Sequence, residues 1–269
     1  MSTETTPVSP CQLVVTAGNP DERVRAAAIG LAQELGLPFS DADDDSGDGP
    51  ELTLVAGEHR LELRETRRGG AGSVFVDFVG GPIGYRRQSA LSRRQPIALA
   101  VGLRRGPVTV VDATAGLARD SFLLACLGCT VIAIERSRVL GALIRDGLAR
   151  AAAEGPPAVQ AILSRITLIV DDARDVLVET TGAAAPDVVY LDPMYPPKKK
   201  TALPKKEIRI CRRLVGDDPD ADELVAVARR VAKRRVVVKR HPHAPPLAPH
   251  PALQFAGKQV RYDVYLPHA

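Results

Sequence analysis

From residue 96 onward, short apolar runs alternate with longer stretches in which apolar residues recur at helical spacing. Apolar runs of this kind form strands that are buried on both faces of a parallel sheet. We expect strands at 108–112, 130–135, 166–170, 188–191 and 235–239, and helices at 96–103, 119–127, 138–153, 157–164 and 222–233. Two last runs, 253–256 and 259–266, predict a closing antiparallel hairpin. The alternation predicts a Rossmann-like α/β fold with a mostly parallel seven-stranded sheet.

The first part of the chain has a different pattern. It predicts strands at 12–16, 52–56, 61–65 and 74–79, with one helix at 24–35. We interpret residues 1–85 as a small α+β domain whose first ten residues are disordered, and residues 86–269 as the larger domain. Five aspartates gather in an acidic loop at 41–48, for which the sequence suggests no role.

Charge and cysteine content narrow the functional class. The formal net charge is only +4, but basic residues cluster at 86–105, 198–213 and 229–240, which favours a polyanionic partner. Cys126 and Cys129 form a C-x-x-C pair without the second pair that a zinc site needs, so we expect buried thiols and no metal. No signal peptide or transmembrane run is evident, which predicts a cytoplasmic protein with no membrane partner.

The loop after the strand at 108–112 is a candidate donor site. It contains one glycine, Gly116, whereas a loop that binds a dinucleotide pyrophosphate shows G-x-G-x-x-G, so a nicotinamide dehydrogenase is disfavoured. S-adenosylmethionine has no phosphate and needs instead acceptors for its amino and ribose hydroxyl groups. Acids at successive strand ends offer these, with two arginines beside them. The predicted donor-site residues are Asp112, Gly116, Arg119, Asp120, Glu135, Arg136, Asp172 and Asp192.

The apolar strand at 188–191 runs into a candidate acceptor site, Asp192-Pro193-Met194-Tyr195. A carboxylate can accept an N–H from the exocyclic amine of a nucleobase, proline fixes the backbone after it, and tyrosine offers a stacking face. We therefore predict that Asp192, Pro193 and Tyr195 are catalytic. Basic residues that follow this motif, and two at the start of the larger domain, predict phosphate contacts with RNA: Lys198, Lys199, Lys200, Lys205, Lys206, Arg209, Arg86 and Arg87.

The pairing of 110–120 with 188–200 resembles the ribosomal RNA small subunit methyltransferase J family. The resemblance implies a class I S-adenosylmethionine-dependent methyltransferase that acts on the N2 amine of one guanosine in small-subunit (16S) ribosomal RNA. It implies donor contacts at Arg119, Asp120, Glu135, Arg136, Asp172, Ala173 and Asp192. The chain departs from the family pattern where serines commonly stand at Asp172 and Ala173, and phenylalanine at Tyr195.

Two alternatives stay open at this stage. Related acidic, proline-containing loops serve methyltransferases that modify DNA adenine or protein glutamine. A second possibility is a non-catalytic RNA-binding or ribosome assembly factor. We expect a monomer that binds small-subunit ribosomal RNA or the 30S subunit.

Overall fold

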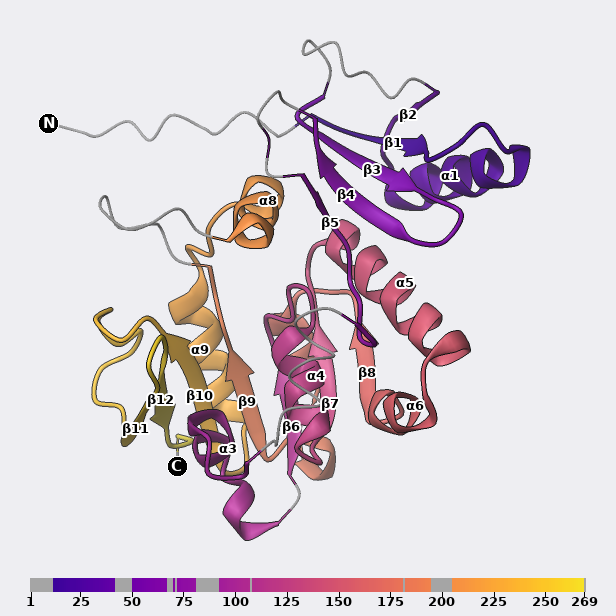
Figure 1. Ribbon diagram of the computed structural model, residues 1–269. Helices are drawn as coiled ribbons and strands as arrows, with labels where there is room; N and C mark the ends of the chain where they lie inside the picture. The colour runs from indigo at the N-terminus through magenta and orange to yellow at the C-terminus, as the bar shows by residue number, and fades with distance from the viewer. Residues whose placement is uncertain are drawn as a thin grey trace, which may run out of the picture. The chain divides into compact units, whose positions relative to one another are not determined.

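Two β-sheets organise the chain, and each belongs to its own unit (Figure 1). The computed structural model describes residues 12–41, 50–66, 70, 72–80, 92–106, 108–180, 182–194 and 205–268. The first unit combines Met1–Phe75 with Lys200–Gly216, and the second combines Val76–Lys199 with Asp217–Ala269. The sequence prediction of one boundary after residue 85 did not include this exchange of a segment, and residue 85 lies outside the described residues.

The first unit is built on a five-stranded sheet in the order β2-β1-β3-β4-β5. Its strands are β1 (Leu13–Ala17), β2 (Phe39–Ser40), β3 (Leu52–Ala56), β4 (Leu61–Glu65) and β5 (Ser73–Val74). Helix α1 (Glu22–Leu35) begins at Asp21, whose carboxylate accepts the backbone N–H of Arg23 and Val24, and it ends at Gly36 in the left-handed conformation. The predicted helix and the β3–β4 hairpin are confirmed.

The predicted strand at 74–79 is wrong beyond Val74. The Asp77 carboxylate accepts the backbone N–H groups of Val79 and Gly80, both at 2.9 Å. This local turn gives the backbone donors a side-chain partner, so they do not pair with a neighbouring strand.

The second unit contains a seven-stranded sheet in the order β11-β12-β10-β9-β6-β7-β8. Its strands are β6 (Thr109–Asp112), β7 (Thr130–Ile134), β8 (Ile166–Ile169), β9 (Val188–Leu191), β10 (Arg235–Arg240), β11 (Leu253–Ala256) and β12 (Arg261–Tyr265). Strands β6 to β10 pair in parallel, whereas β12 is antiparallel to both β10 and β11. The predicted seven-stranded sheet with its terminal hairpin is confirmed.

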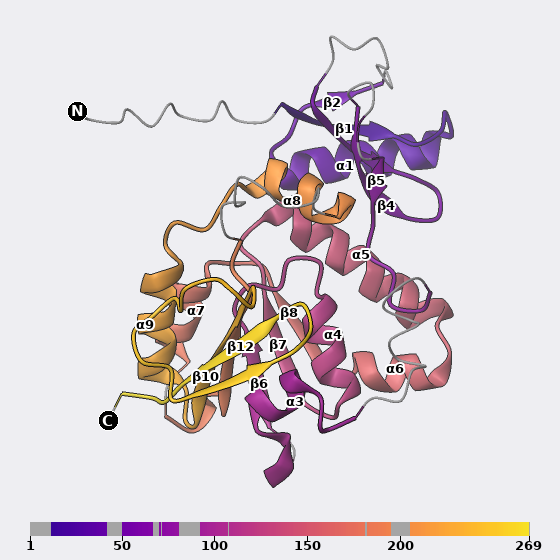
Figure 2. The ribbon, with the colours of Figure 1, turned by 60° about the vertical axis from the view of Figure 1, so that its left-hand side comes forward.

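Helices cover both faces of this sheet, because successive residues of a buried strand point to opposite sides. Val188 and Tyr190 pack toward α3, α4 and α6, whereas Val189 and Leu191 pack toward α7 and α9. Figure 2 shows α7 and α9 to the left of the strands and α4 and α6 to their right. The helices of this unit are α3 (Pro96–Val101), α4 (Arg119–Cys126), α5 (Arg138–Glu154), α6 (Pro157–Leu163), α7 (Ala173–Glu179) and α9 (Ala221–Val231), with 3-10 turns η1 (Leu103–Arg105) and η2 (Gly182–Ala184).

Helix α8 (Lys206–Val215) belongs to the first unit, although it lies between β9 and α9 in sequence. It packs against β4 and β5, and Arg213 forms an ion pair with Glu65 of β4. Ile210 and Cys211 are buried, while Lys206 and Arg213 are exposed. The chain therefore leaves the larger sheet after β9, contributes a basic helix to the smaller unit, and returns before α9.

We expect Gly147→Ala to lower the free energy of unfolding by about 1–3 kcal/mol, the range for overpacking a closed site. A Cβ at Gly147 of α5 would lie 2.6 Å from Val76 Cγ1 and 3.0 Å from the Val76 carbonyl oxygen. Gly30→Ala is the matched control, because nothing lies within 4 Å of its added Cβ. In helix α1 that change should stabilise by about 0.5–1 kcal/mol. Urea unfolding of both variants checks the difference, and equal effects would contradict the close approach at Gly147.

Candidate active site

The candidate site lies where the carboxyl ends of β10, β9, β6 and β7 stand side by side. In the sheet, Asp112 of β6 is in register with Tyr190 of β9 on one side and with Ala133 of β7 on the other. The chain leaves β6 toward one edge of the sheet and β9 toward the other, so the order of strands reverses between them. Open α/β sheets bind ligands in the crevice at such a point.

Asp112 holds the loop that follows β6. Its carboxylate accepts a hydrogen bond from Ser121 Oγ at 2.5 Å and from the backbone N–H of Thr114 at 3.3 Å. Thr114 Oγ1 in turn accepts the backbone N–H of Asp192 at 2.6 Å. Asp112 is only 1% exposed, and burial raises its pKa to about 7, with a smaller contribution from the Asp120 carboxylate. The buried acid thus connects the predicted donor loop to the predicted acceptor loop.

Asp112 should make the apo-protein less stable as the pH rises. The folded protein keeps the Asp112 proton up to about pH 7, whereas an unfolded aspartate loses it near pH 4. The folded state therefore binds more protons between about pH 4 and pH 7, so the free energy of unfolding falls across this window. Asp112→Asn should remove this contribution, which is at most about 4 kcal/mol. Chemical denaturation at pH 4.5 and pH 8 tests it, and parallel pH profiles for the variant and the unmodified protein would contradict it.

Glu135 follows β7 and binds the other part of the loop that follows β6. One carboxylate oxygen accepts the backbone N–H of Gly116 at 2.7 Å, and the other accepts that of Ser137 at 2.8 Å. Glu135 is 6% exposed, and burial raises its pKa to about 7. Gly116 has φ +59°, and a Cβ there would meet no heavy atom within 4 Å. The backbone at Gly116 therefore faces open space directly beside a buried carboxylate.

Lys239, at the end of β10, joins two of the predicted acids. Its ammonium lies 2.8 Å from Asp120 Oδ2 and 2.8 Å from Asp192 Oδ2. Tyr190 donates its hydroxyl proton to the same Asp120 oxygen at 2.6 Å. The sequence analysis did not include Lys239 among the site residues. The sequence did contain a signal for it, because Lys239 directly follows three valines of a predicted strand whose carboxyl end lies at the same edge of the sheet.

A second cluster of charged side chains connects the acceptor loop to the residues that follow β7. Arg136 forms ion pairs with Asp218 and, at 3.1 Å, with Asp220. Asp218 also accepts the backbone N–H of Met194 at 2.6 Å, and the backbone N–H of Asp218 donates to the Met194 carbonyl at 3.0 Å. The two ends of the excursion that contains α8 are therefore hydrogen-bonded to each other.

Asp172 caps the start of α7, and its carboxylate forms an ion pair with Arg174. Its carboxylate accepts the backbone N–H of Arg174 and pairs with the Arg174 side chain at 2.7 Å. Because of this pairing, its pKa lies below the ordinary value. Arg174 also reaches Asp220 at 3.2 Å, so Asp172 and Arg136 belong to one charge network.

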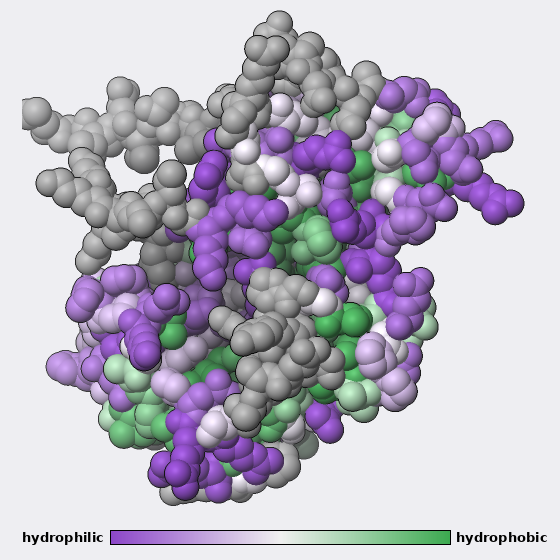
Figure 3. All heavy atoms as spheres, in the orientation of Figure 1, coloured by the Kyte–Doolittle hydropathy of each residue, from purple (hydrophilic) through white to green (hydrophobic). Residues whose placement is uncertain are grey.

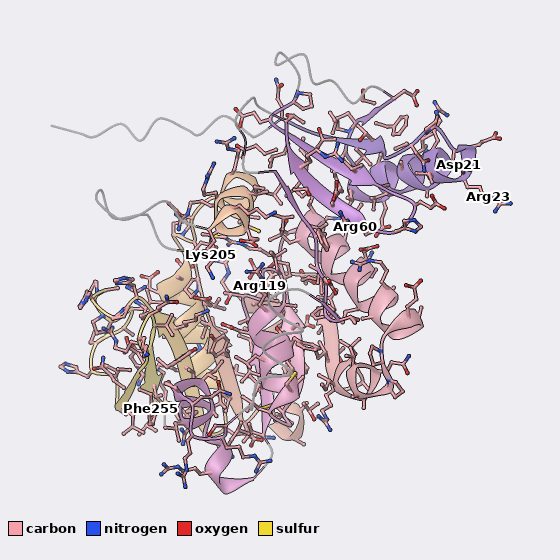
Figure 4. All side chains as sticks on the ribbon, viewed as in Figure 1. Asp21, Arg23, Arg60, Arg119, Lys205 and Phe255 are labelled. Atoms are coloured by element: carbon pink, nitrogen blue, oxygen red, sulfur yellow. The ribbon has the colours of Figure 1, made fainter. Side chains whose placement is uncertain are left out.

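The other predicted residues divide by location. Arg119 is the first residue of α4, after Ala118 in the left-handed conformation, and Figure 4 labels it at that end of the helix. Ala173 and Pro193 are buried. Lys205, which Figure 4 also labels, stands at the start of α8, and Lys206 and Arg209 lie on that helix, all in the first unit. The predicted residues outside the described part of the chain are Tyr195, Lys198, Lys199, Lys200, Arg86 and Arg87.

Within the described ranges, no cluster of three or more histidine, cysteine or acidic residues could hold a metal ion. No described helix is long and apolar enough to cross a membrane.

Comparison with known proteins identifies the family of this chain. Residues 32–267 match the family model described as "Putative SAM-dependent methyltransferase". Ribosomal RNA small subunit methyltransferase J of Thioalkalivibrio sulfidiphilus is 47% identical over 247 residues, covering 91% of this chain and 94% of the relative. The chain belongs to the ribosomal RNA small subunit methyltransferase J family. The member from Photobacterium profundum is 45% identical and covers 96% of this chain and 99% of its own length.

A solved structure is similar to this chain over nearly its full length. The crystal structure of the SAM-dependent methyltransferase NGO1261 from Neisseria gonorrhoeae superposes with a TM-score of 0.68 at 37% identity, covering 95% of this chain and 96% of that one. The resemblance, the Rossmann-like class I fold and the enzyme class predicted from the sequence are confirmed, and S-adenosylmethionine is the cofactor of the family.

The residues at the sheet edge fit this cofactor. S-adenosylmethionine carries a sulfonium and an ammonium group, and the carboxylates of Asp120 and Asp192 lie together at the ends of neighbouring elements. The open space at Gly116 beside Glu135 suits a ribose, which needs a hydroxyl acceptor and close backbone approach.

Proposed function

We propose that the protein transfers a methyl group from S-adenosylmethionine to the exocyclic N2 amine of one guanosine in small-subunit ribosomal RNA. The observation that carries the proposal is the placement of Asp192. Its backbone is fixed by Thr114 and by the buried Pro193, while 41% of its side chain remains exposed at the sheet edge. In a chain of this family, a fixed and accessible carboxylate at this position suits a base amine.

Asp192 has a specific task in this chemistry. The amine lone pair is delocalised into the guanine ring, so it attacks poorly by itself. S-adenosylmethionine supplies a methyl group already activated by its sulfonium. A carboxylate that accepts one N–H of the amine increases electron density on nitrogen and stabilises the positive charge that develops as the N–C bond forms and the methyl–sulfur bond of the donor breaks to leave a neutral thioether. The proton then leaves nitrogen through Asp192 to water.

We assign the donor side to the residues around the β6 loop. Glu135 accepts ribose hydroxyls, Asp120 and Arg119 face the amino-acid end of the donor, and Gly116 allows close approach. Asp112 acts through the loop that it holds, since its oxygens already accept bonds from Ser121 and Thr114. We assign the contacts with the donor's adenine to three residues that follow β7 and β8, namely Arg136, Asp172 and Ala173.

We assign the RNA side to basic residues around the acceptor motif and on α8. Lys205 and Lys206 are exposed, Arg209 is half-buried, and Figure 3 shows the surface of α8 in view as hydrophilic. Lysine and arginine side chains on such a surface pair with phosphates and make binding depend on salt. Lys198, Lys199, Lys200, Arg86 and Arg87 extend this set, and Tyr195 stacks on the target base. We further propose that the protein acts as a monomer in the cytoplasm.

Nucleoside analysis of ribosomal RNA tests the proposal. RNA from a strain that lacks the gene should miss one N2-methylguanosine in the small subunit, and the purified protein with S-adenosylmethionine should restore it. Methylation of adenine, of DNA or of a protein glutamine in place of guanosine would overturn the assignment of the substrate. An unchanged RNA that nonetheless binds the protein would favour an assembly role.

A further inference from the structure

An ammonium group held between two carboxylates lies inside the candidate site. Lys239 comes from β10, Asp192 from the end of β9 and Asp120 from the first turn of α4, and both distances to the ammonium are 2.8 Å. The Lys239 side chain is 22% exposed and that of Asp120 is 13% exposed. Three elements that are remote in sequence thus place their charges at one point.

Packing alone does not account for a lysine at this position. The preceding residues of the strand, Val236, Val237 and Val238, are fully buried. An apolar residue could continue that run, whereas removing an ammonium from water is costly and is offset only by the two carboxylates. We therefore expect the charge of Lys239 to matter for the two carboxylates that it contacts, Asp120 and Asp192.

The groups around Asp192 shift its pKa in opposite directions. Partial burial and the neighbouring carboxylates of Asp120 and Asp218 raise the pKa of Asp192, and Lys239 lowers it. Among the described residues, Tyr190 of β9 and Asp112 of β6 also lie near Asp192, and Arg136 is paired with Asp218. Of these described neighbours, Lys239 is the positively charged one that contacts the Asp192 carboxylate directly.

We propose that Lys239 is a positioning residue that keeps Asp192 ionised and fixes one of its oxygens, which leaves the other oxygen to accept the amine N–H. The inference rests on the proposed function of Asp192. Lys239 is not itself a base, because Asp192 and Asp120 hold its pKa far above the ordinary lysine value against the effect of burial. In the described structure, Asp192 Oδ2 is the oxygen that contacts Lys239.

The test compares Lys239→Met with the control Lys233→Met, which removes an exposed lysine just before the same strand. The single-turnover rate of methyl transfer is measured from pH 5.5 to pH 9.5 at saturating donor and RNA. Lys239→Met should move the acid limb upward by about one pH unit or more, the usual effect of one adjacent opposite charge. Each unit of movement lowers the rate tenfold on the acid side, and Lys239→Arg should restore much of the original profile.

A second measurement does not use activity. The free energy of unfolding of Lys239→Met should fall more steeply between pH 5 and pH 8 than that of the unmodified protein, because Asp192 and Asp120 ionise without a partner. Adding Asp192→Asn to that variant should reduce the extra slope. If Lys239→Met does not fold, Lys239→Gln keeps a hydrogen-bonding chain of similar length without the charge and is measured in the same way.

The outcomes separate this inference from the proposed function. If the unmodified protein produces no N2-methylguanosine, the proposed function fails whatever Lys239 does. If it does produce that nucleoside and the pH profile of Lys239→Met keeps its shape with a uniform loss of rate, Lys239 has a structural role only and the inference is overturned.

Discussion

Asp192→Ala should lower the rate of methyl transfer by about 10²–10³-fold, the loss typical when one preorganised electrostatic contact to the transition state is removed. The protein should still fold, because Lys239 keeps Asp120 as an ion-pair partner and Thr114 contacts the backbone of residue 192 rather than its side chain. S-adenosylmethionine binding should remain measurable by calorimetry, since Glu135 and the β6 loop are untouched.

Asp192→Asn is the matched variant for this experiment. It keeps the size of the side chain and one carbonyl acceptor but loses the negative charge, so it should retain more activity than Asp192→Ala and less than the unmodified protein. Single-turnover assays with radiolabelled donor measure both. Unchanged turnover in Asp192→Ala would remove Asp192 from the chemistry, and loss of donor binding together with turnover would make it a donor-site residue instead.

Glu135→Ala should weaken S-adenosylmethionine binding by about 10–100-fold, which corresponds to the loss of a charged hydrogen bond. Two kinds of interaction are lost, because Glu135 is proposed to accept ribose hydroxyls and also accepts the backbone N–H groups of Gly116 and Ser137. Glu179→Ala is the control, since Glu179 is exposed at the end of α7. Isothermal calorimetry at pH 8 measures both affinities.

The same residue predicts a pH dependence of donor binding. Burial raises the pKa of Glu135 to about 7, and the ionised form is the stronger hydrogen-bond acceptor. Donor affinity should therefore rise as the pH increases from 6 to 8, and Glu135→Gln should flatten this rise. A flat profile in the unmodified protein would place the ribose away from Glu135.

The sequence was sufficient to predict the larger sheet and the edge that carries the site. Runs such as Val188–Leu191 indicate strands buried on both faces, and parallel strands bring their carboxyl ends to one edge. That alone placed Asp112, Glu135 and Asp192 near one another, and the structure links the loops of all three through hydrogen bonds.

Side-chain partners could not be predicted in this way. The Lys239 contacts with Asp120 and Asp192 join residues that are 119 and 47 positions apart, and they depend on the register of β9 against β10. The turn at Asp77 depends on competition between a local carboxylate and a strand partner, which hydrophobic spacing does not express. Nor does periodicity indicate that α8 packs on β4 and β5 rather than on the larger sheet.

The reciprocal hydrogen bonds between Met194 and Asp218 have a consequence for how the family can diversify. They close the base of the excursion that carries α8, so changes of length or composition beyond that base leave the alignment of β9 with β10 intact. Under the proposed assignment, Asp192 precedes this base, whereas Tyr195 and the proposed RNA contacts on α8 lie beyond it. Exchanging residues 195–217 between relatives therefore tests whether this segment carries the proposed contacts with the RNA.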